Sequence, residues 1–441
     1  MLPAFTTSAK LIAFIAIVIF LHACKTGPGL FGKKTPHEQY GDKLTGAGLK
    51  ETTLGRAWFD AAERSLTNPM TIKVPYKETG YFAADRPQAM GLRFQARRGE
   101  KLNISLSKRP AAGFLIYMEL WKAADAVGKA PKLVAAADTV LYAIEHEADD
   151  EASYIIRLQP ELLNSGEYTL NIASGPSLAY PIKAPGKNHV QSFWGDARDA
   201  GARKHEGIDM FAAKRTPVVA AADGRVTRVN ENTLGGKVVW MRPHNRDYVL
   251  YYAHLDEQLV SDGQDVNAGD TLGLIGNTGN AKYTAPHLHF GIYASGGAID
   301  PYPFVNPEVR TPRAITAGID NLGKFVRAGS KAVKIYAGLD EQPAVLLDQH
   351  TLMEVEAAAE DWYKVRLPDG RQGLIKSNQS NALTELRKYI PKQELAVYDR
   401  PDTLAARKII IKAGNALSVL AAFNNYYFVR TEADLTGWIL K

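Results

Sequence analysis

Short segments in which apolar and polar residues alternate, separated by turns, constrain the fold of this chain most strongly. Between residues 70 and 180 they are residues 71–74, 91–96, 102–106, 154–158 and 168–172. Successive side chains of a strand point to opposite faces, so this period of two predicts half-buried β-strands. The 441 residues suffice for several domains with separate cores. We therefore expect a mainly β, multi-domain protein in which residues 70–180 form a β-sandwich.

The N-terminus carries the pattern of an export signal. An apolar run from Leu11 to Leu21 follows Lys10 and is too short to span a bilayer comfortably. The next residues, Leu21-His22-Ala23-Cys24, resemble a bacterial lipobox, in which the cysteine is acylated and becomes the new N-terminus. We predict a signal peptide over residues 1–23 and an exported lipoprotein anchored through Cys24. The alternative is a plain secretory signal with an incidental cysteine.

Residues 24–69 are predicted to form a tether and one short helix. Residues 25–48 are polar and Gly-rich, which indicates a flexible linker. Residues 53–66 place their apolar side chains at helical spacing and stop before Asn68-Pro69.

The charge and the cysteine content exclude several classes of protein. Lysine and arginine number 53 against 47 acidic residues, a net charge of +6 that is spread along the chain. Such a mild excess suits an anionic cell envelope, whereas nucleic-acid binding requires a concentrated basic face, so no nucleic-acid partner is expected. Cys24 is the single cysteine, which excludes internal disulfides and a Cys-rich metal site.

The C-terminal third contains an internal repeat. Residues 362–366 followed by 373–375 have the same pattern as residues 426–430 followed by 437–439. The repeat resembles tandem bacterial SH3-like barrels, which implies two such domains over residues 319–383 and 384–441. The repeated aromatic residues are either platforms for wall peptides or members of the barrel cores; they are Trp362, Tyr363, Tyr426 and Tyr427.

The region 185–305 carries the chemistry. Five of the ten histidines lie between residues 205 and 289. Imidazole and carboxylate groups suit zinc, and three such ligands would leave one tetrahedral position open for water. His287 and His289 are spaced by two on a predicted strand, so both imidazoles face one side and can share a pocket without both binding metal. His205 and Asp209 are spaced by four, on a helix or on a bent loop and strand.

A second interpretation concerns Glu206. The segment His205-Glu206-Gly207-Ile208-Asp209 is a variant of the H-E-x-x-H helix, in which the glutamate would be a general base. Gly207 and the absence of a helical pattern around it favour loop and strand instead. Glu206 is then expected to face solvent or the rim of the site.

The order of these motifs resembles the lysostaphin/LytM-type zinc endopeptidases. The resemblance rests on His205-x-x-x-Asp209, Tyr252-x-His254, a Gly-rich segment over residues 269–279 and Pro286-His-Leu-His-Phe290. It implies an antiparallel β peptidase domain with one zinc ion per chain. By the same resemblance His205, Asp209 and His289 would bind the zinc, and His254 and His287 would be the unliganded catalytic pair. Lys282 and Tyr283, in the loop before the last motif, would line the groove.

The combination of export, tethering and a zinc peptidase domain points to peptidoglycan as the substrate. The resemblance implies a zinc metalloendopeptidase that hydrolyses peptide cross-links, as a D,D-endopeptidase or, more narrowly, on glycyl-glycine bridges. The alternative from another class is a catalytically silent scaffold or activator of cell-wall hydrolases, although such relatives lack the metal ligands. We expect a location in the cell envelope, at the outer membrane, in the periplasm or on the cell surface. The sequence leaves the oligomeric state open.

Overall fold

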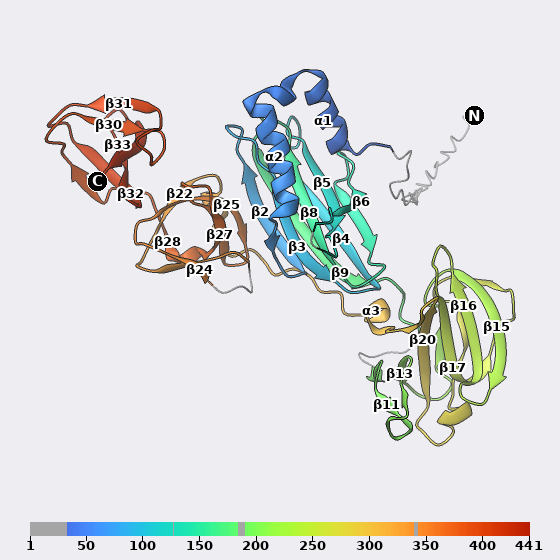
Figure 1. Cartoon of the computed structure of the whole chain (residues 1–441). Coiled ribbons are helices and arrows are strands. Elements are labelled where there is room, and N and C mark those ends of the chain that lie inside the picture. The colour runs from blue at the N-terminus through green and yellow to red at the C-terminus, as the bar shows by residue number, and fades with distance from the viewer. Residues whose placement is uncertain (1–32, 127, 184–189, 339–342) are drawn as a thin grey trace, which may run out of the picture. The chain divides into compact units, whose positions relative to one another are not determined.

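The computed structural model describes residues 33–126, 128–183, 190–338 and 343–441, and β-strands dominate it, as predicted (Figure 1). The predicted export signal and Cys24 lie outside the described residues. Of the helices within the described ranges, none combines the length and the apolar character needed to cross a bilayer. The domain boundaries given above stay predictions.

The first described element is a helix in the segment that was expected to be flexible. Helix α1 (Pro36–Gly46) begins with a capping box: Thr35 Oγ1 accepts the Glu38 N–H at 3.1 Å, and the Thr35 N–H donates to the Glu38 carboxylate at 2.8 Å. A short 3₁₀ turn (Leu49–Glu51) leads to α2 (Thr53–Thr67), the helix that the sequence predicted. The linker is therefore shorter than expected, because the caps and buried side chains stabilise α1.

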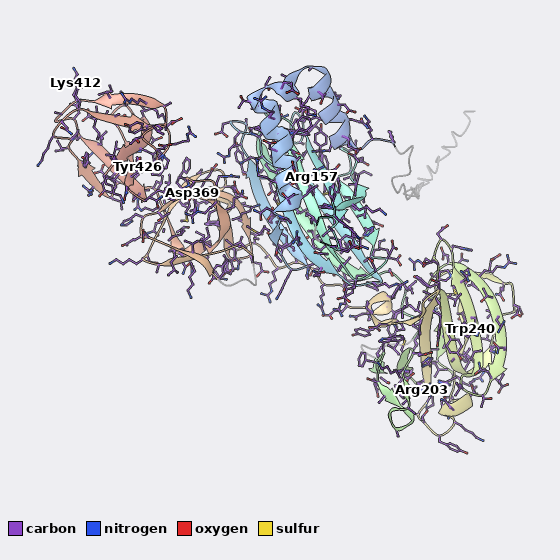
Figure 2. The ribbon with its side chains drawn as sticks, in the orientation of Figure 1. Arg157, Arg203, Trp240, Asp369, Lys412 and Tyr426 are labelled. Carbon is purple, nitrogen blue, oxygen red and sulfur yellow. The ribbon has the colours of Figure 1, made fainter. Side chains whose placement is uncertain are left out.

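A polar cluster fixes α1 to the strands beneath it. His37 stacks on Trp58 with ring centroids 4.7 Å apart, and its Nε2 lies 2.6 Å from Gln159 Oε1. Arg157, labelled in Figure 2, donates to His37 Nδ1 at 3.1 Å and forms a buried ion pair with Glu119. These buried polar groups have the partners that make their burial tolerable.

Two sheets enclose the first core. One has the strand order β1-β3-β8-β5-β6, and the strands β2-β9-β4-β7 form part of a second, larger sheet. Their bounds are β1 (Met70–Thr71), β2 (Tyr76–Phe82), β3 (Met90–Ala96), β4 (Glu100–Arg109), β5 (Ile116–Lys122), β6 (Lys132–Ala136), β7 (Ala143–Glu147), β8 (Ala152–Pro160) and β9 (Gly166–Pro176). Alternate side chains of these strands form the buried core, including Leu92, Leu102, Ile156 and Leu170. This is the two-layer packing that the period of two predicts.

The central region forms an antiparallel sheet in the order β10-β13-β20-β17-β16-β15-β18, with β14, β19 and β21 paired beside it. Its strands are β10 (Val190–Ser192), β13 (Ile208–Phe211), β14 (Pro217–Val219), β15 (Gly224–Asn232), β16 (Gly236–Pro243), β17 (Val249–Gln258), β18 (Asp265–Val266), β19 (Thr271–Ile275), β20 (His287–Ala294) and β21 (Gly297–Ile299). A separate hairpin joins β11 (Ala197–Arg198) to β12 (Arg203–Lys204), and the short helix α3 (Tyr302–Val305) follows the sheet. Figure 2 labels Trp240 on this sheet and Arg203 on the hairpin.

The predicted repeat forms two sets of strands with matching registers. The first set is β22 (Phe325–Ala328), β23 (Val333–Tyr336), β24 (Pro343–Leu347), β25 (Leu352–Ala359), β26 (Trp362–Arg366), β27 (Gln372–Lys376) and β28 (Ser380–Ala382). The second is β29 (Arg387–Tyr389), β30 (Leu395–Tyr398), β31 (Arg407–Ile411), β32 (Leu417–Phe423), β33 (Tyr426–Arg430) and β34 (Thr436–Leu440). Val365 pairs with Gly373 in one set, and Val429 pairs with Gly437 in the other. Of these strands, β25 also pairs with β2 of the larger sheet.

Candidate metal and catalytic site

Two neighbouring strands bring Asp209 and His289 together. Asp209 lies on β13 and His289 on β20, and the two residues are directly opposite each other in the antiparallel register. Opposite residues of such a pair have β-carbons about 4.5–5.5 Å apart, so their side chains can reach a common ion. The distance from Asp209 Oδ1 to His289 Nδ1 is 3.0 Å.

His205 enters the same site from the segment just before β13. The hairpin fixes its backbone, because the His205 N–H donates to the Asp196 carbonyl at 2.8 Å. Its Nδ1 lies 2.9 Å from the Phe193 carbonyl, which can only accept, so Nδ1 carries the proton. The lone pair of Nε2 is therefore available on the side of Asp209 and His289, and metal-binding histidines are commonly oriented in this way.

The three predicted ligands have donor atoms with the spacing of a zinc site. His205 Nε2 lies 3.0 Å from Asp209 Oδ1 and 3.0 Å from His289 Nδ1. Tetrahedral zinc with ligands at 2.0–2.2 Å requires ligand atoms roughly 3.3–3.5 Å apart, a few tenths of an ångström more. Within the described residues, these three side chains form a group of possible metal ligands, and their ligand atoms all lie within 4.8 Å of one another. Two imidazoles and one carboxylate fit zinc and leave a coordination position free.

Gly207 makes room for the His289 ring. A β-carbon at residue 207 would lie 2.7 Å from both Cε1 and Nε2 of His289 and 2.6 Å from the Phe290 carbonyl oxygen. Contacts below 3.0 Å force atoms to move, and the Phe290 carbonyl belongs to a paired strand. The glycine that argued against a helix is therefore also needed for the position of the His289 ring, a predicted ligand.

The remaining two predicted residues face the same site from two other positions. His254 on β17 and His287 at the start of β20 have ring centroids 5.0 Å apart, and the His254 ring lies 5.8 Å from that of His289. Nδ1 of His254 lies 2.9 Å from the Thr278 carbonyl, and Nδ1 of His287 lies 2.8 Å from the Ala285 carbonyl. Both Nδ1 atoms are therefore protonated donors, which leaves each Nε2 as a proton acceptor.

The backbone of His254 has an unusual conformation. Its φ is 62°, in the left-handed region that costs non-glycine residues roughly 1–3 kcal/mol, and it lies beside a register shift in β17. The His254 N–H donates to the Gly235 carbonyl at 2.8 Å, which helps to maintain this conformation. Strained residues of this kind concentrate at functional sites.

Burial and neighbouring groups tune the charges at the site. Burial, reinforced by His289 and His287, lowers the pKa of His254 to about 4, so this ring is neutral at neutral pH. Burial also lowers the pKa of His289. Burial alone would raise the pKa of Asp209, but the contacts with His205 and His289 outweigh it and hold that pKa well below its usual range. Asp209 is thus a carboxylate and the rings of His254 and His289 are neutral at neutral pH. Carboxylate and neutral imidazole are the forms that bind metal.

The helical interpretation of the segment around Glu206 is wrong. Residues 203–204 and 208–211 are strands, and Glu206 between them is exposed, as the loop interpretation predicted. Lys282 and Tyr283 are also exposed, with the Lys282 ammonium 5.8 Å from the centre of the Tyr283 ring.

Sequence reasoning missed the polar groups behind the ligands. Arg198 Nη2 donates to Asp209 Oδ2 at 2.9 Å, and Ser192 Oγ lies 3.3 Å from His205 Nδ1. Nothing in the spacing of Ser192 or Arg198 indicated a contact with the proposed ligands. An aromatic group was also missed: Trp240 and Tyr293 contact Tyr251, whose ring centroid lies 5.9 Å from that of His289.

Comparisons with known proteins single out this region. Residues 203–301 match the model of peptidase family M23. The L-Ala–D-Glu endopeptidase of Bacillus subtilis is 36% identical over 137 residues, which are 28% of this chain and 42% of that protein. The peptidoglycan DD-endopeptidase ShyC of Vibrio cholerae is 38% identical over 94 residues, 21% of each chain.

A third relative has a different kind of name. The murein hydrolase activator NlpD of Salmonella typhimurium is 34% identical over 136 residues, which are 30% of this chain and 34% of that protein. The chain thus spans less than half the length of each of these three relatives.

Proposed function

The chain carries a peptidase family M23 domain, as its sequence motifs predicted, and we propose that it is a zinc-dependent endopeptidase that hydrolyses peptide cross-links of peptidoglycan. The observation that carries the proposal is the convergence of three ligand atoms at 3.0 Å with two further imidazoles beside them. His205, Asp209 and His289 would hold the zinc. When bound there, zinc lowers the pKa of a water molecule and polarises the scissile carbonyl.

Two histidine side chains of the protein then transfer the proton. His254 and His287 are held by carbonyl groups at Nδ1, so each presents the Nε2 lone pair as an acceptor. One of them takes the proton of the attacking water at Nε2 and, as imidazolium, can give it to the leaving amine. The other histidine, when it is protonated at Nε2, donates a hydrogen bond to the developing oxyanion.

The substrate class and the location rest on the relatives and on the N-terminus. One relative is named a peptidoglycan DD-endopeptidase and another an L-Ala–D-Glu endopeptidase, so the two names give different bonds. We propose D,D-endopeptidase activity on cross-links, performed in the cell envelope by a lipoprotein that is anchored to a membrane through Cys24. Nucleic acid is not a proposed partner.

The second candidate is a catalytically silent activator of cell-wall hydrolases. The similarity to the activator NlpD supports it. An activator needs the peptidase fold but neither a metal ligand set nor a pair of oriented imidazoles, and this chain has both. The enzyme is therefore the better-supported candidate.

Purified cross-linked muropeptides, incubated with the chain from residue 25 onward and analysed by mass spectrometry, test the proposal. We expect cleavage of the cross-link, loss of activity with a chelator and recovery with zinc. Products cut at L-Ala–D-Glu or within a glycine bridge would change only the assignment of the scissile bond and would leave the endopeptidase activity in place. Intact muropeptides with zinc-loaded protein, together with stimulation of a separate hydrolase, would establish the activator instead.

A further inference from the structure

The two carboxylate oxygens of Asp209 have separate partners. Oδ1 faces His205 Nε2 and His289 Nδ1, each at 3.0 Å, on the side of the proposed zinc site. Oδ2 accepts a hydrogen bond from Arg198 Nη2 at 2.9 Å. The Asp209 side chain is 11% exposed and that of Arg198 is 30% exposed, so the contact is partly shielded from solvent. Such charge-assisted hydrogen bonds are stronger than neutral ones.

Arg198 is itself held in place by the strands around the site. It lies on β11, which pairs with β12 directly before His205, so the hairpin fixes its backbone relative to a second ligand. Its Nη2 also donates to Ser192 Oγ, and Ser192 is the register partner of Asp209 across β10 and β13. Ser192 Oγ in turn donates to Asp196 Oδ2 at 3.0 Å. Arg198 is thus aimed at Oδ2 by a connected set of hydrogen bonds.

The hydrogen bond from Arg198 to Oδ2 limits how Asp209 can bind a metal ion. A carboxylate can bind zinc through one oxygen or through both, and the second oxygen would take up the position that a catalytic site leaves open. A donor fixed on Oδ2 disfavours binding through both oxygens.

We propose that Arg198 is a positioning residue that reserves Oδ2 of Asp209, so that Asp209 binds zinc through Oδ1 alone and one coordination position stays open. This inference rests on the zinc site of the proposed function. It concerns how a proposed ligand is oriented, and Arg198 itself is neither a proposed zinc ligand nor a proposed catalytic residue.

The test compares Arg198→Gln with Arg198→Lys in the chain from residue 25 onward. Zinc affinity is measured by competition with a chelator, and the coordination is read from the visible absorption spectrum of the cobalt-substituted protein. We expect Arg198→Gln to bind zinc about 10- to 100-fold more weakly, the range for lost outer-shell partners. The visible absorption bands of its cobalt-substituted form should weaken. If Oδ2 also binds, the metal gains a fifth ligand atom, and five-coordinate cobalt absorbs less strongly than four-coordinate cobalt. Arg198→Lys should recover most of both properties, since one donor to Oδ2 suffices.

Lys204→Gln serves as the matched control, because it removes a positive charge from the partner strand of the same hairpin and should change neither property. Unchanged zinc affinity and an unchanged cobalt spectrum in Arg198→Gln would overturn the proposal. If Arg198→Gln does not fold, Ser192→Ala carries the test, with a severalfold loss of zinc affinity expected and no loss contradicting the role. Failure of the parent protein to bind zinc would instead reject the proposed function.

Discussion

Asp209 and His289 are opposite partners across two antiparallel strands, and their facing side-chain atoms lie 3.0 Å apart. The sheet register therefore sets the geometry of two of the three proposed ligands before any metal binds. A one-residue slip of β13 would turn Asp209 to the other face of the sheet. The third ligand, His205, precedes β13 and depends on the hairpin instead.

Gly207→Ala should disturb the site without removing a ligand. The added methyl would lie 2.7 Å from the His289 ring and 2.6 Å from the Phe290 carbonyl oxygen, so the ring must move. We expect zinc affinity to fall at least tenfold and the domain to lose about 1–3 kcal/mol of stability. Isothermal titration with zinc and urea unfolding measure the two effects. Gly296→Ala is the control, because nothing lies within 4 Å of its added β-carbon; equal behaviour of the two variants would contradict the steric role of Gly207.

Substitution at His254 should separate catalysis from metal binding. His254→Gln removes a proton acceptor whose Nδ1 is fixed by the Thr278 carbonyl, so we expect kcat to fall about 10²- to 10⁴-fold while the zinc content stays near one per chain. His289→Ala should lower both, because it deletes a ligand atom. Zinc content by mass spectrometry and muropeptide hydrolysis measure the two properties. Loss of zinc from His254→Gln would move His254 into the ligand set.

The strands could be predicted from the sequence because they depend on local patterns. Period-two alternation identified strands such as β3 and β8, and the spacing of two in His287-Leu288-His289 placed both imidazoles on one face. The choice of His205, Asp209 and His289 as ligands came from the family resemblance, and their roles stay predictions. The geometry brings all five proposed residues into one site.

What the sequence did not indicate depends on how very short strands pair with one another. The contact of Arg198 with Asp209 requires both the β11–β12 hairpin and the β10–β13 pairing, which no local pattern encodes. Helix α1 is a different case, since Thr35, Pro36 and Glu38 form a readable capping box that the Gly-rich composition obscured.

The sequence also left open whether the repeated aromatic residues belong to the cores or form binding platforms. Tyr363 is only 3% exposed and belongs to a core. The Lys376 ammonium lies 4.0 Å from the centre of the Trp362 ring, and Arg387 covers Tyr427 at 4.9 Å. These contacts favour a packing role for the three aromatic residues over a role as platforms for wall peptides. One ring is buried, and the other two are already covered by cations.

Acid should weaken the attachment of α1 through His37. Burial, and then Arg157, lowers the pKa of His37 below its unfolded value of 6.5. Arg157 donates to Nδ1, so the neutral ring is the form that fits. Because the folded pKa is the lower one, the stability is present above pH 6.5 and is lost as the pH falls towards the folded pKa. Urea unfolding at pH 7.5 and pH 5, followed by far-UV circular dichroism, should show a larger decrease in the free energy of unfolding for the parent protein than for His37→Gln. Equal decreases would contradict the role of His37.

The predicted lipid anchor is tested at Cys24. The motif Leu21-His22-Ala23-Cys24 implies acylation, and more than one acyl chain is needed for firm attachment, since a single chain binds membranes only marginally. Cys24→Ser should therefore move the protein from the membrane fraction to the soluble fraction of the envelope. Its muropeptide hydrolysis should stay unchanged, because the proposed catalytic residues lie in other segments. Thr26→Ala, which keeps the cysteine, is the matched control. If Cys24→Ser still sediments with membranes after a high-salt wash, another part of the chain holds it there, because salt removes electrostatic contacts but not inserted acyl chains.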